Sequence, residues 1–302
     1  MEKIIVIGGS GFIGQAIQQC VLGQKKKNSF VFSYYLHPEK INDNLEKIQI
    51  NLLQPNTIKL VKDYPIALYV AGSGDHRLAS ISPSLDLELN VKTFLNFLEQ
   101  FKGNLVLLSS QAVYYGLKGE ISEDVKHLPT VPYGLSKKAI EAYAEYFFMK
   151  RKLSKLWILR LMYAFGEGEK EQRLIPRCAR AALTGEKVII FGKGNSLLNP
   201  LPSSFVAEIL IKAIEHIKNE EDGFFEVTNL NYPRKVRVID VVRFLQSIKN
   251  FNYTISKKRE EMPIEFYGSI KKICTYMKKW NVQFPDLGIN LKRYFTKLTK
   301  GT

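Results

Sequence analysis

The stretch "KIIVIGGSGFIG", residues 3–14, joins an apolar run directly to a glycine-rich turn. Gly8, Gly11 and Gly14 stand three residues apart, and an amphipathic helix is expected over 13–22. In such a turn the first glycine permits a tight bend, the second lets a pyrophosphate approach the backbone, and the third lets helix and strand pack closely. A purely structural turn is the alternative, but the strand before it and the helix after it favour a dinucleotide-binding unit.

Strands and helices continue to alternate through the first half of the chain. Runs rich in Val, Ile and Leu predict parallel strands that are buried on both faces. The expected strands are KIIVI (3–7), FVFSY (30–34), KIQIN (47–51), IALYV (66–70), NLVLLS (104–109) and KLWILR (155–160). Helical stretches fall between them, for example at 13–22, 85–101 and 136–151. This order predicts an α/β fold, a Rossmann-type doubly wound parallel sheet of about seven strands.

The pattern changes after residue 165, where a polar, glycine-containing loop begins. Beyond it, helices are expected over 173–184 and 204–218, strands over 187–191 and 224–229, and then a lysine-rich tail. The predicted division is a dinucleotide-binding domain of residues 1–165 plus about 203–228, and a smaller C-terminal α/β substrate domain of residues 166–202 and 229–302.

The composition is that of a globular chain with a strong positive charge. Its 302 residues carry a formal net charge of +15. The basic residues form no stripe interleaved with aromatics, so nucleic-acid binding is not expected, whereas polyanionic cofactors and substrates are favoured. No apolar run approaches the roughly 20 residues that cross a bilayer, and the N-terminus does not resemble a signal peptide, so a cytoplasmic protein is expected. The three cysteines lack metal-ligand spacing, so no metal site is expected.

Two further stretches carry groups that can move a proton. In "LLSSQAVYYG", 107–116, a predicted strand delivers Ser110 to the carboxyl edge of the sheet, where ligands bind in such folds. In "PYGLSKKAIE", 132–141, Tyr133 and Lys137 stand one helical turn apart. An ammonium group there should lower the pKa of the phenol, so that Tyr133 can exchange a proton with a substrate oxygen to which Ser110 also hydrogen bonds. The pair could be ordinary helix surface, but the glycine-rich turn favours a role in hydride transfer to a nicotinamide.

Together these motifs resemble those of the extended short-chain dehydrogenases/reductases of the NAD-dependent epimerase/dehydratase type. The resemblance also rests on NVKTFLNFLE (90–99), LRLMYAFGEG (159–168), ALTGEKVIIFGKGNS (182–196) and SSFVAEILIKAIE (203–215). It implies catalytic roles for Ser110, Tyr133 and Lys137, and Asn90 matches the asparagine that supports the lysine. The residues expected at the cofactor are Gly8, Gly11, Phe12, Ile13, Gly14, Ser33, Asn51, Ala71, Asn90, Tyr133 and Lys137.

The resemblance also implies a substrate and an assembly. Most members act on nucleotide-diphosphate sugars, usually at C4, which implies a nucleotide-sugar substrate and a place in surface-polysaccharide biosynthesis. Family relatives often dimerise through the helix that carries the tyrosine and the lysine. The stretch "AIEAYAEYFF" is apolar on more than one side, which fits either a homodimer seam or burial within one subunit.

The chain departs from the family pattern where the cofactor ribose should bind. The second strand should end in an acid, but Ser33, Tyr34 and Tyr35 stand in that neighbourhood, so no carboxylate would repel a 2′-phosphate. NADP(H) is therefore favoured as the cofactor, with NAD(H) possible. Asn51 stands where an aspartate near the adenine is usual, and the strand before it ends as in relatives of 4-keto-sugar reductases, which favours a reductase.

The substrate side departs further from the family. Tyr163 replaces the usual asparagine, and Leu198 stands where an arginine commonly grips the phosphates. The residues that could supply that contact, although each is expected to be a solvated charge, are Lys193, Arg173 and Arg177. His76, on the loop after the fourth strand, could face the nicotinamide side, but a loop histidine is usually a surface residue, so no role is assigned to it.

The sequence thus predicts an NAD(P)-dependent oxidoreductase or epimerase for a hydroxyl or keto group, at C4, of a nucleotide-activated sugar. A reductase is favoured over an epimerase. Gln111 and Ala112 replace the acidic pair that follows the catalytic hydroxyl in dehydratases, so 4,6-dehydration is not expected. The alternative from another class is a non-catalytic NADP(H)-binding regulator, which Tyr163 and Leu198 would fit.

Overall fold

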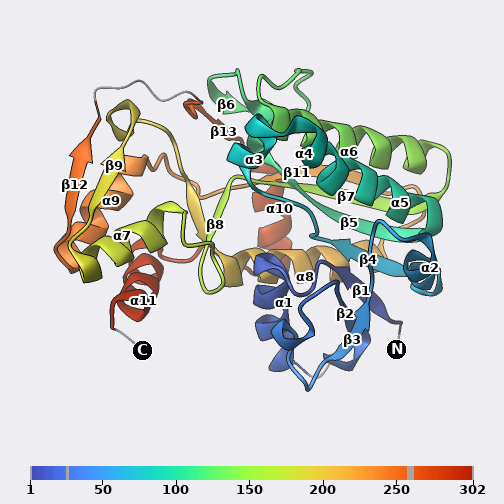
Figure 1. Cartoon of the computed structure of the whole chain (residues 1–302). Helices are drawn as coiled ribbons and strands as arrows, with labels where there is room; N and C mark the ends of the chain where they lie inside the picture. Colours follow the sequence, from blue (N-terminus) through green and yellow to red (C-terminus); the bar gives the residue numbers. More distant parts are fainter. Residues whose placement is uncertain (1, 25–26, 257–261, 301–302) are drawn as a thin grey trace.

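A computed structural model describes residues 2–24, 27–256 and 262–300. Its centre is a seven-stranded, all-parallel sheet in the order β11-β7-β5-β4-β1-β2-β3 (Figure 1). The strands are β1 (Ile4–Ile7), β2 (Phe30–Tyr34), β3 (Glu46–Gln49), β4 (Ile66–Tyr69), β5 (Gly103–Ser110), β7 (Leu153–Leu161) and β11 (Phe225–Leu230). The predicted Rossmann-type sheet is therefore confirmed.

The sheet is buried on both faces by helices. Ile4 and Val6 of β1 belong to one core and Ile5 and Ile7 to the other, because successive side chains of a strand point in opposite directions. The first core is covered by α1 (Phe12–Leu22), α8 (Ser203–Asn219) and α10 (Lys271–Trp280). The second is covered by α2 (Pro55–Ile58), α5 (Thr93–Gln100) and α6 (Pro132–Met149). Two-sided burial explains why strands such as β1 and β4 are continuous apolar runs.

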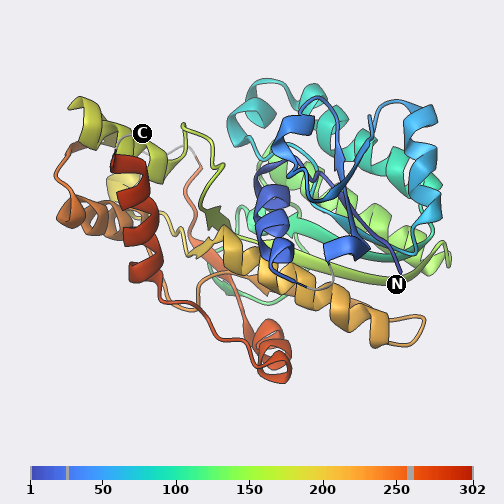
Figure 2. The same ribbon diagram turned by 90° about the horizontal axis from the view of Figure 1, so that it is seen from below.

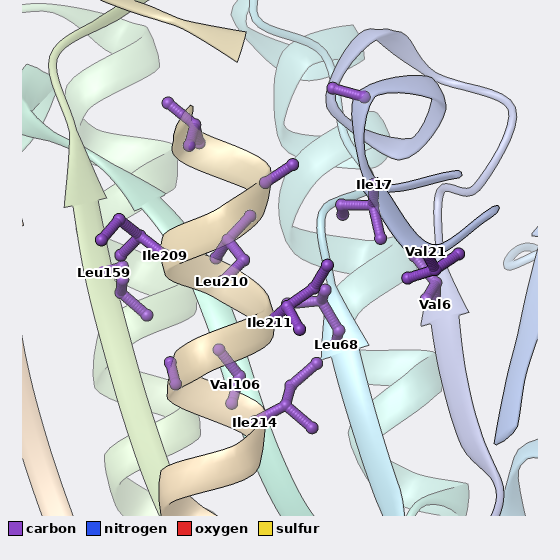
Figure 3. Close-up of a cluster of buried hydrophobic side chains, with 14 of the residues drawn as sticks. Val6, Ile17, Val21, Leu68, Val106, Leu159, Ile209, Leu210, Ile211 and Ile214 are labelled. Atoms are coloured by element: carbon purple, nitrogen blue, oxygen red, sulfur yellow. The ribbon is translucent and has the colours of Figure 1, made fainter. Parts of the chain in front are cut away.

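Helix α8 and strand β11 return to the sheet from beyond residue 202. Figure 2 shows α8 running along one face of the sheet. The isoleucines and the leucine on its inner side lie among Leu68, Val106 and Leu159 of the strands and Ile17 of α1 (Figure 3). Each such side chain contributes roughly 1.5–3 kcal/mol when it is fully buried.

Helix α10 lies on the sheet as well, although its residues were expected in the substrate domain. Its Ile273 and Met277 join the core beneath α8, and the ring of Tyr276 lies 4.6 Å from that of Trp157 on β7. The sequence predicts only a lysine-rich tail here, because the lysines that dominate this segment occupy the exposed side of an amphipathic helix. We call the sheet with α1, α2, α3 (His76–Ile81), α4 (Pro83–Leu87), α5, α6, α8 and α10 the sheet lobe.

The remaining elements form a second lobe around a separate core that includes Phe165, Ile175, Leu245 and Phe295. They are α7 (Leu174–Thr184), β9 (Lys187–Ile190), α9 (Val238–Ile248), β12 (Asn252–Ile255) and α11 (Leu287–Thr299). Short parallel pairs lie between the lobes in Figure 1: β8 (Tyr163–Phe165) with β10 (Pro200–Pro202), and β6 (Gly119–Ile121) with β13 (Phe266–Gly268). None of the helices in the described ranges is long and apolar enough to cross a membrane.

Helix α6 is fastened to the sheet by a buried ion pair. Arg160 on β7 donates to both carboxylate oxygens of Glu141, at 3.0 and 2.8 Å, and both side chains are almost fully buried. Ser109 on β5 donates to the same carboxylate at 2.6 Å. The remaining guanidinium nitrogen of Arg160 donates to the hydroxyl of Tyr114 and to the carbonyl oxygen of Glu123. These bonds fix the helix that carries Tyr133 and Lys137 against the ends of β5 and β7.

Replacing Glu141 by Gln should lower the free energy of unfolding by about 3–5 kcal/mol, because the Arg160 guanidinium would stay buried without its counter-charge. Urea denaturation followed by circular dichroism measures the change. Asp43→Asn is the matched control, since Asp43 pairs with Lys47 but has 96% of its side chain exposed, and it should change stability by less than about 1 kcal/mol. An equally small change in Glu141→Gln would contradict the role given to this pair.

Candidate active site

The glycine-rich turn packs so closely that side chains are excluded from it. Gly8 has φ +93°, and a Cβ on it would lie 2.8 Å from the backbone of Ala71 at the end of β4. A Cβ on Gly14 would lie 2.3 Å from the carbonyl oxygens of Gly8 and Gly9. The N–H of Gly11 donates to the carbonyl of Gly8 at 3.0 Å. The turn therefore has the tight form that the spacing predicts, and it brings Ala71 beside Gly8.

The start of α1 fits the phosphates of a dinucleotide. Gly11 is the N-cap of this helix. Glycine has no side chain that could accept a hydrogen bond from the first N–H groups of the helix, those of Phe12 and Ile13. Such N–H groups at the positive end of a helix bind anions. The residues present are therefore compatible with a pyridine dinucleotide at this turn.

Ser33 and Asn51 each accept a hydrogen bond from a backbone N–H group of the protein. The hydroxyl of Ser33 is nearly buried and accepts the N–H of Gly8 at 3.0 Å, so it holds the glycine-rich turn from within. The side chain of Asn51 accepts the N–H of Leu53 at 3.0 Å and closes a local turn. Contacts of these two residues with the adenosine part of a cofactor stay predictions.

The structure brings Ser110, Tyr133 and Lys137 together at the carboxyl edge of the sheet. Ser110 is the last residue of β5, and Tyr133 is the second residue of α6. The side chain of Ser110 interacts with that of Tyr133 and lowers its pKa, and the hydroxyl of Ser110 accepts the N–H of Ala112 at 3.1 Å. The Nζ of Lys137 lies 5.6 Å from the centroid of the Tyr133 ring. Tyr133 and Lys137 are only 7% and 5% exposed.

Burial, rather than the ammonium group, dominates the acidity of Tyr133. Its pKa is raised to about 12, mainly by burial and also by the charge of Asp86, while Ser110 and the charge of Arg173 oppose the shift. Lys137 is not among the groups that lower this pKa, and its expected effect on the phenol stays a prediction. Burial also lowers the pKa of Lys137 to about 8, which weakens the ammonium as a source of positive charge.

Asn90 lies next to Lys137, as the resemblance implies. It sits in a π-helical turn, Glu88–Lys92, between α4 (Pro83–Leu87) and α5. Such turns inside α-helices are frequent at functional sites. A Cβ on Gly72, which has φ +123°, would lie 2.5 Å from the Asn90 Oδ1 and 3.5 Å from the Lys137 Nζ. Glycine at position 72 thus leaves room for these two side chains to approach each other.

His76, to which the sequence assigned no role, packs against Tyr133. It is the first residue of α3 (His76–Ile81), and its ring centroid lies 4.3 Å from that of Tyr133 and 5.8 Å from that of Tyr115. Burial, assisted by the charge of Arg173, lowers the pKa of His76 to about 4, so the imidazole is neutral near pH 7. The available sequence signal was its position just after β4, at the ligand-binding edge of the sheet.

Arg173 is not a freely solvated charge. Its guanidinium lies 3.9 Å from the centroid of the Tyr163 ring, and its Nε lies 3.3 Å from Glu169. Tyr163 donates to the same carboxylate at 2.6 Å. The charge of Arg173 lowers the pKa of both His76 and Tyr133, so this side chain acts on the site from the second lobe.

The other positions considered for a phosphate contact have local roles. Leu198 is buried in the core of the second lobe. Arg177 donates to the carbonyl oxygen of Ile189 at 3.3 Å, and Lys193 lies in a tight turn with φ +59°. Of the three basic candidates, Arg173 is the one whose charge lowers the pKa of Tyr133.

Residues 4–228 match the family model described as the NAD dependent epimerase/dehydratase family. A protein of Bacillus subtilis named as an uncharacterized UDP-glucose epimerase is 22% identical over 89% of this chain and 90% of its own length. A UDP-N-acetyl-α-D-glucosaminuronate decarboxylase of Bacillus cytotoxicus is 24% identical over 73% of each chain. The structure of UDP-glucose 4-epimerase from Brucella ovis in complex with NAD superposes with a TM-score of 0.85 over 99% of each chain, at 20% identity.

Proposed function

Since the chain belongs to the NAD-dependent epimerase/dehydratase family, we propose that it is an enzyme that inverts the C4 configuration of a nucleotide-activated sugar with a pyridine dinucleotide. The observation that carries the proposal is the convergence of Ser110, Tyr133 and Lys137 beside the glycine-rich turn. The relatives named as UDP-sugar epimerases support an epimerase rather than the reductase that the sequence favoured. The net charge of +15 favours a diphosphate-bearing substrate and cofactor.

Each residue of the site has a defined task in this reaction. The dinucleotide supplies the hydride acceptor and donor. Ser110 hydrogen bonds to the reacting oxygen of the sugar and to Tyr133, which aligns the two oxygens. Tyr133 exchanges a proton with that oxygen: as a phenol it donates to a ketone, and as a phenolate it accepts from a hydroxyl. Lys137 places its amino group 5.6 Å from the centroid of the Tyr133 ring, and Asn90 borders it.

Because the pKa of Tyr133 is raised, oxidation of the sugar hydroxyl is the more demanding half of the reaction. With its pKa raised to about 12, Tyr133 is protonated near pH 7 and ready to donate to a ketone. Oxidation of a hydroxyl requires the phenolate, which burial and Asp86 disfavour and which Ser110 and Arg173 favour. The rate of oxidation should therefore rise with pH as long as Lys137, with a pKa of about 8, keeps its proton.

Tyr133→Phe should reduce kcat for C4 inversion by about 10²–10⁴-fold, because it removes the group that transfers the proton. The assay follows conversion of a panel of UDP-hexoses by purified, dinucleotide-loaded protein, with products separated by chromatography. Tyr253→Phe, on β12 of the second lobe, is the matched control and should keep full activity. Wild-type protein that binds the dinucleotide but converts none of the panel would favour the non-catalytic regulator instead.

A second candidate is a reductase that uses NADPH, and the end of β2 supports it. Ser33 is occupied by the N–H of Gly8, and the next residues are Tyr34 and the exposed Tyr35, so no carboxylate follows the strand directly. The first acid beyond, Glu39, pairs with His37 at 2.9 Å. A 2′-phosphate would meet no unpaired carboxylate among these residues.

This candidate predicts that NADP⁺ binds at least as tightly as NAD⁺, because a 2′-phosphate is attracted by a basic surface and not repelled by an acid. Calorimetric titration of the purified protein with each dinucleotide measures the two dissociation constants. An affinity for NAD⁺ more than about tenfold higher, a difference of about 1.4 kcal/mol, would discard the NADPH-dependent reductase.

A homodimer is the assembly we propose, through α4 and α6. These adjacent helices expose large apolar side chains, namely Leu85, Leu87, Leu135, Tyr143, Tyr146 and Met149. Apolar patches of this kind commonly mark protein–protein interfaces. Light scattering should give twice the chain mass of 34.6 kDa, and Tyr146→Glu should halve that value, because burying a carboxylate in such a seam is unfavourable. A wild-type mass of one chain would contradict the dimer.

A further inference from the structure

Asp86 is a fully buried carboxylate next to the site, and the roles assigned so far do not use it. It lies in α4, one turn before Asn90, with 0% of its surface exposed. Its Oδ1 accepts the Nδ2–H of Asn90 at 2.8 Å. Its Oδ2 has no hydrogen-bond partner within the described residues. An unpartnered carboxylate oxygen in the interior is costly unless a charge lies nearby.

The charge nearby is Lys137. Its ammonium group approaches the Cβ position of Gly72 to 3.5 Å, and the Oδ1 of Asn90 approaches the same position to 2.5 Å. That Oδ1 is a second buried oxygen without a partner in the described part of the chain. Asp86 is also the largest charge acting in favour of the protonated form of Lys137. The Asn90 oxygen therefore lies near the ammonium group, and the charge of Asp86 opposes the effect of burial on it.

We propose that Asp86 is a positioning residue, which fixes the side-chain amide of Asn90 and serves as the buried counter-ion that keeps Lys137 charged. This inference rests on the proposed function only in assigning Lys137 to catalysis. The hydrogen bond to Nδ2 orients the Asn90 amide so that its oxygen, and not its N–H₂ group, faces the space shared with Lys137. An amide turned the other way would present two donors to an ammonium group.

The charges around Lys137 predict the direction in which its pKa should move when Asp86 is replaced. Burial lowers the pKa of Lys137 to about 8, while Asp86 and Glu141 on its own helix raise it. The other groups that face this cluster are Tyr133, His76 on α3 and Arg173 from the second lobe. Removing the charge of Asp86 should therefore move the pKa of Lys137 further down, so that the lysine loses its proton at a lower pH.

Asp86→Asn tests the proposal, because the new amide oxygen can still accept from Asn90 while the charge is lost. The titration of Lys137 is followed by NMR of protein with ¹³C-labelled lysine, with the signal assigned through Lys137→Arg. We expect its pKa to fall by about one unit or more, a tenfold change in the protonation equilibrium. Glu88→Gln, an exposed acid two residues away that pairs with Lys92, is the matched control and should leave the titration unchanged.

The activity profile supplies a second readout. In Asp86→Asn the alkaline limb of kcat should move to lower pH by the same amount, while KM for the nucleotide sugar changes by less than about threefold. An unchanged titration of Lys137 would overturn the proposal even if C4 inversion is found. Absence of C4 inversion in the wild type would overturn the proposed function, while the titration still decides the role of Asp86. If Asp86→Asn fails to fold, Asp86→Ser removes the same charge and is titrated in its place.

Discussion

The bidentate ion pair between Arg160 and Glu141 is the interaction on which the rest of the site depends. It ties β7 to α6, and Ser109 binds the same carboxylate from β5. Ser110 is the next residue along β5, and Lys137 lies one turn before Glu141 on α6. A small shift of α6 along the sheet would therefore separate the hydroxyl, the phenol and the ammonium group, whose chemistry requires alignment to within a fraction of an ångström.

Burial affects the proposed chemistry of this site in two opposing ways. The same desolvation that strengthens each electrostatic contact raises the pKa of Tyr133 and lowers that of Lys137. Both shifts work against the phenolate–ammonium pair that the sequence led us to expect. The buried carboxylates of Asp86 and Glu141 favour the charged lysine, and Arg173 favours the charged tyrosine. The state of the proton is thus a balance among side chains from both lobes.

The second lobe holds Tyr163 and Arg173 in a network of side-chain contacts. Tyr163, which replaces the family's asparagine, carries the guanidinium of Arg173 on its ring and donates to Glu169. The loop around these residues is linked to the sheet lobe by Lys170 and Asp75, 3.7 Å apart, and to α11 by Glu167 and Lys297, 2.6 Å apart. Because Tyr163 is part of this network, its replacement of the family's asparagine favours the proposal of an adapted substrate pocket over that of a degenerated one.

The sequence by itself determined the sheet, the glycine-rich turn and the positions of Ser110, Tyr133 and Lys137. These features are recorded in local spacing: continuous apolar runs, glycines three apart, and two side chains four apart on a helix. Only the tertiary structure decided that His76 packs on Tyr133, that α10 covers the sheet, that Ser33 holds Gly8 and that Asp86 lies buried beside Asn90. The physical reason is that burial and charge neighbours arise from residues distant in the chain, and they set the pKa of Tyr133 in a direction that spacing alone could not indicate.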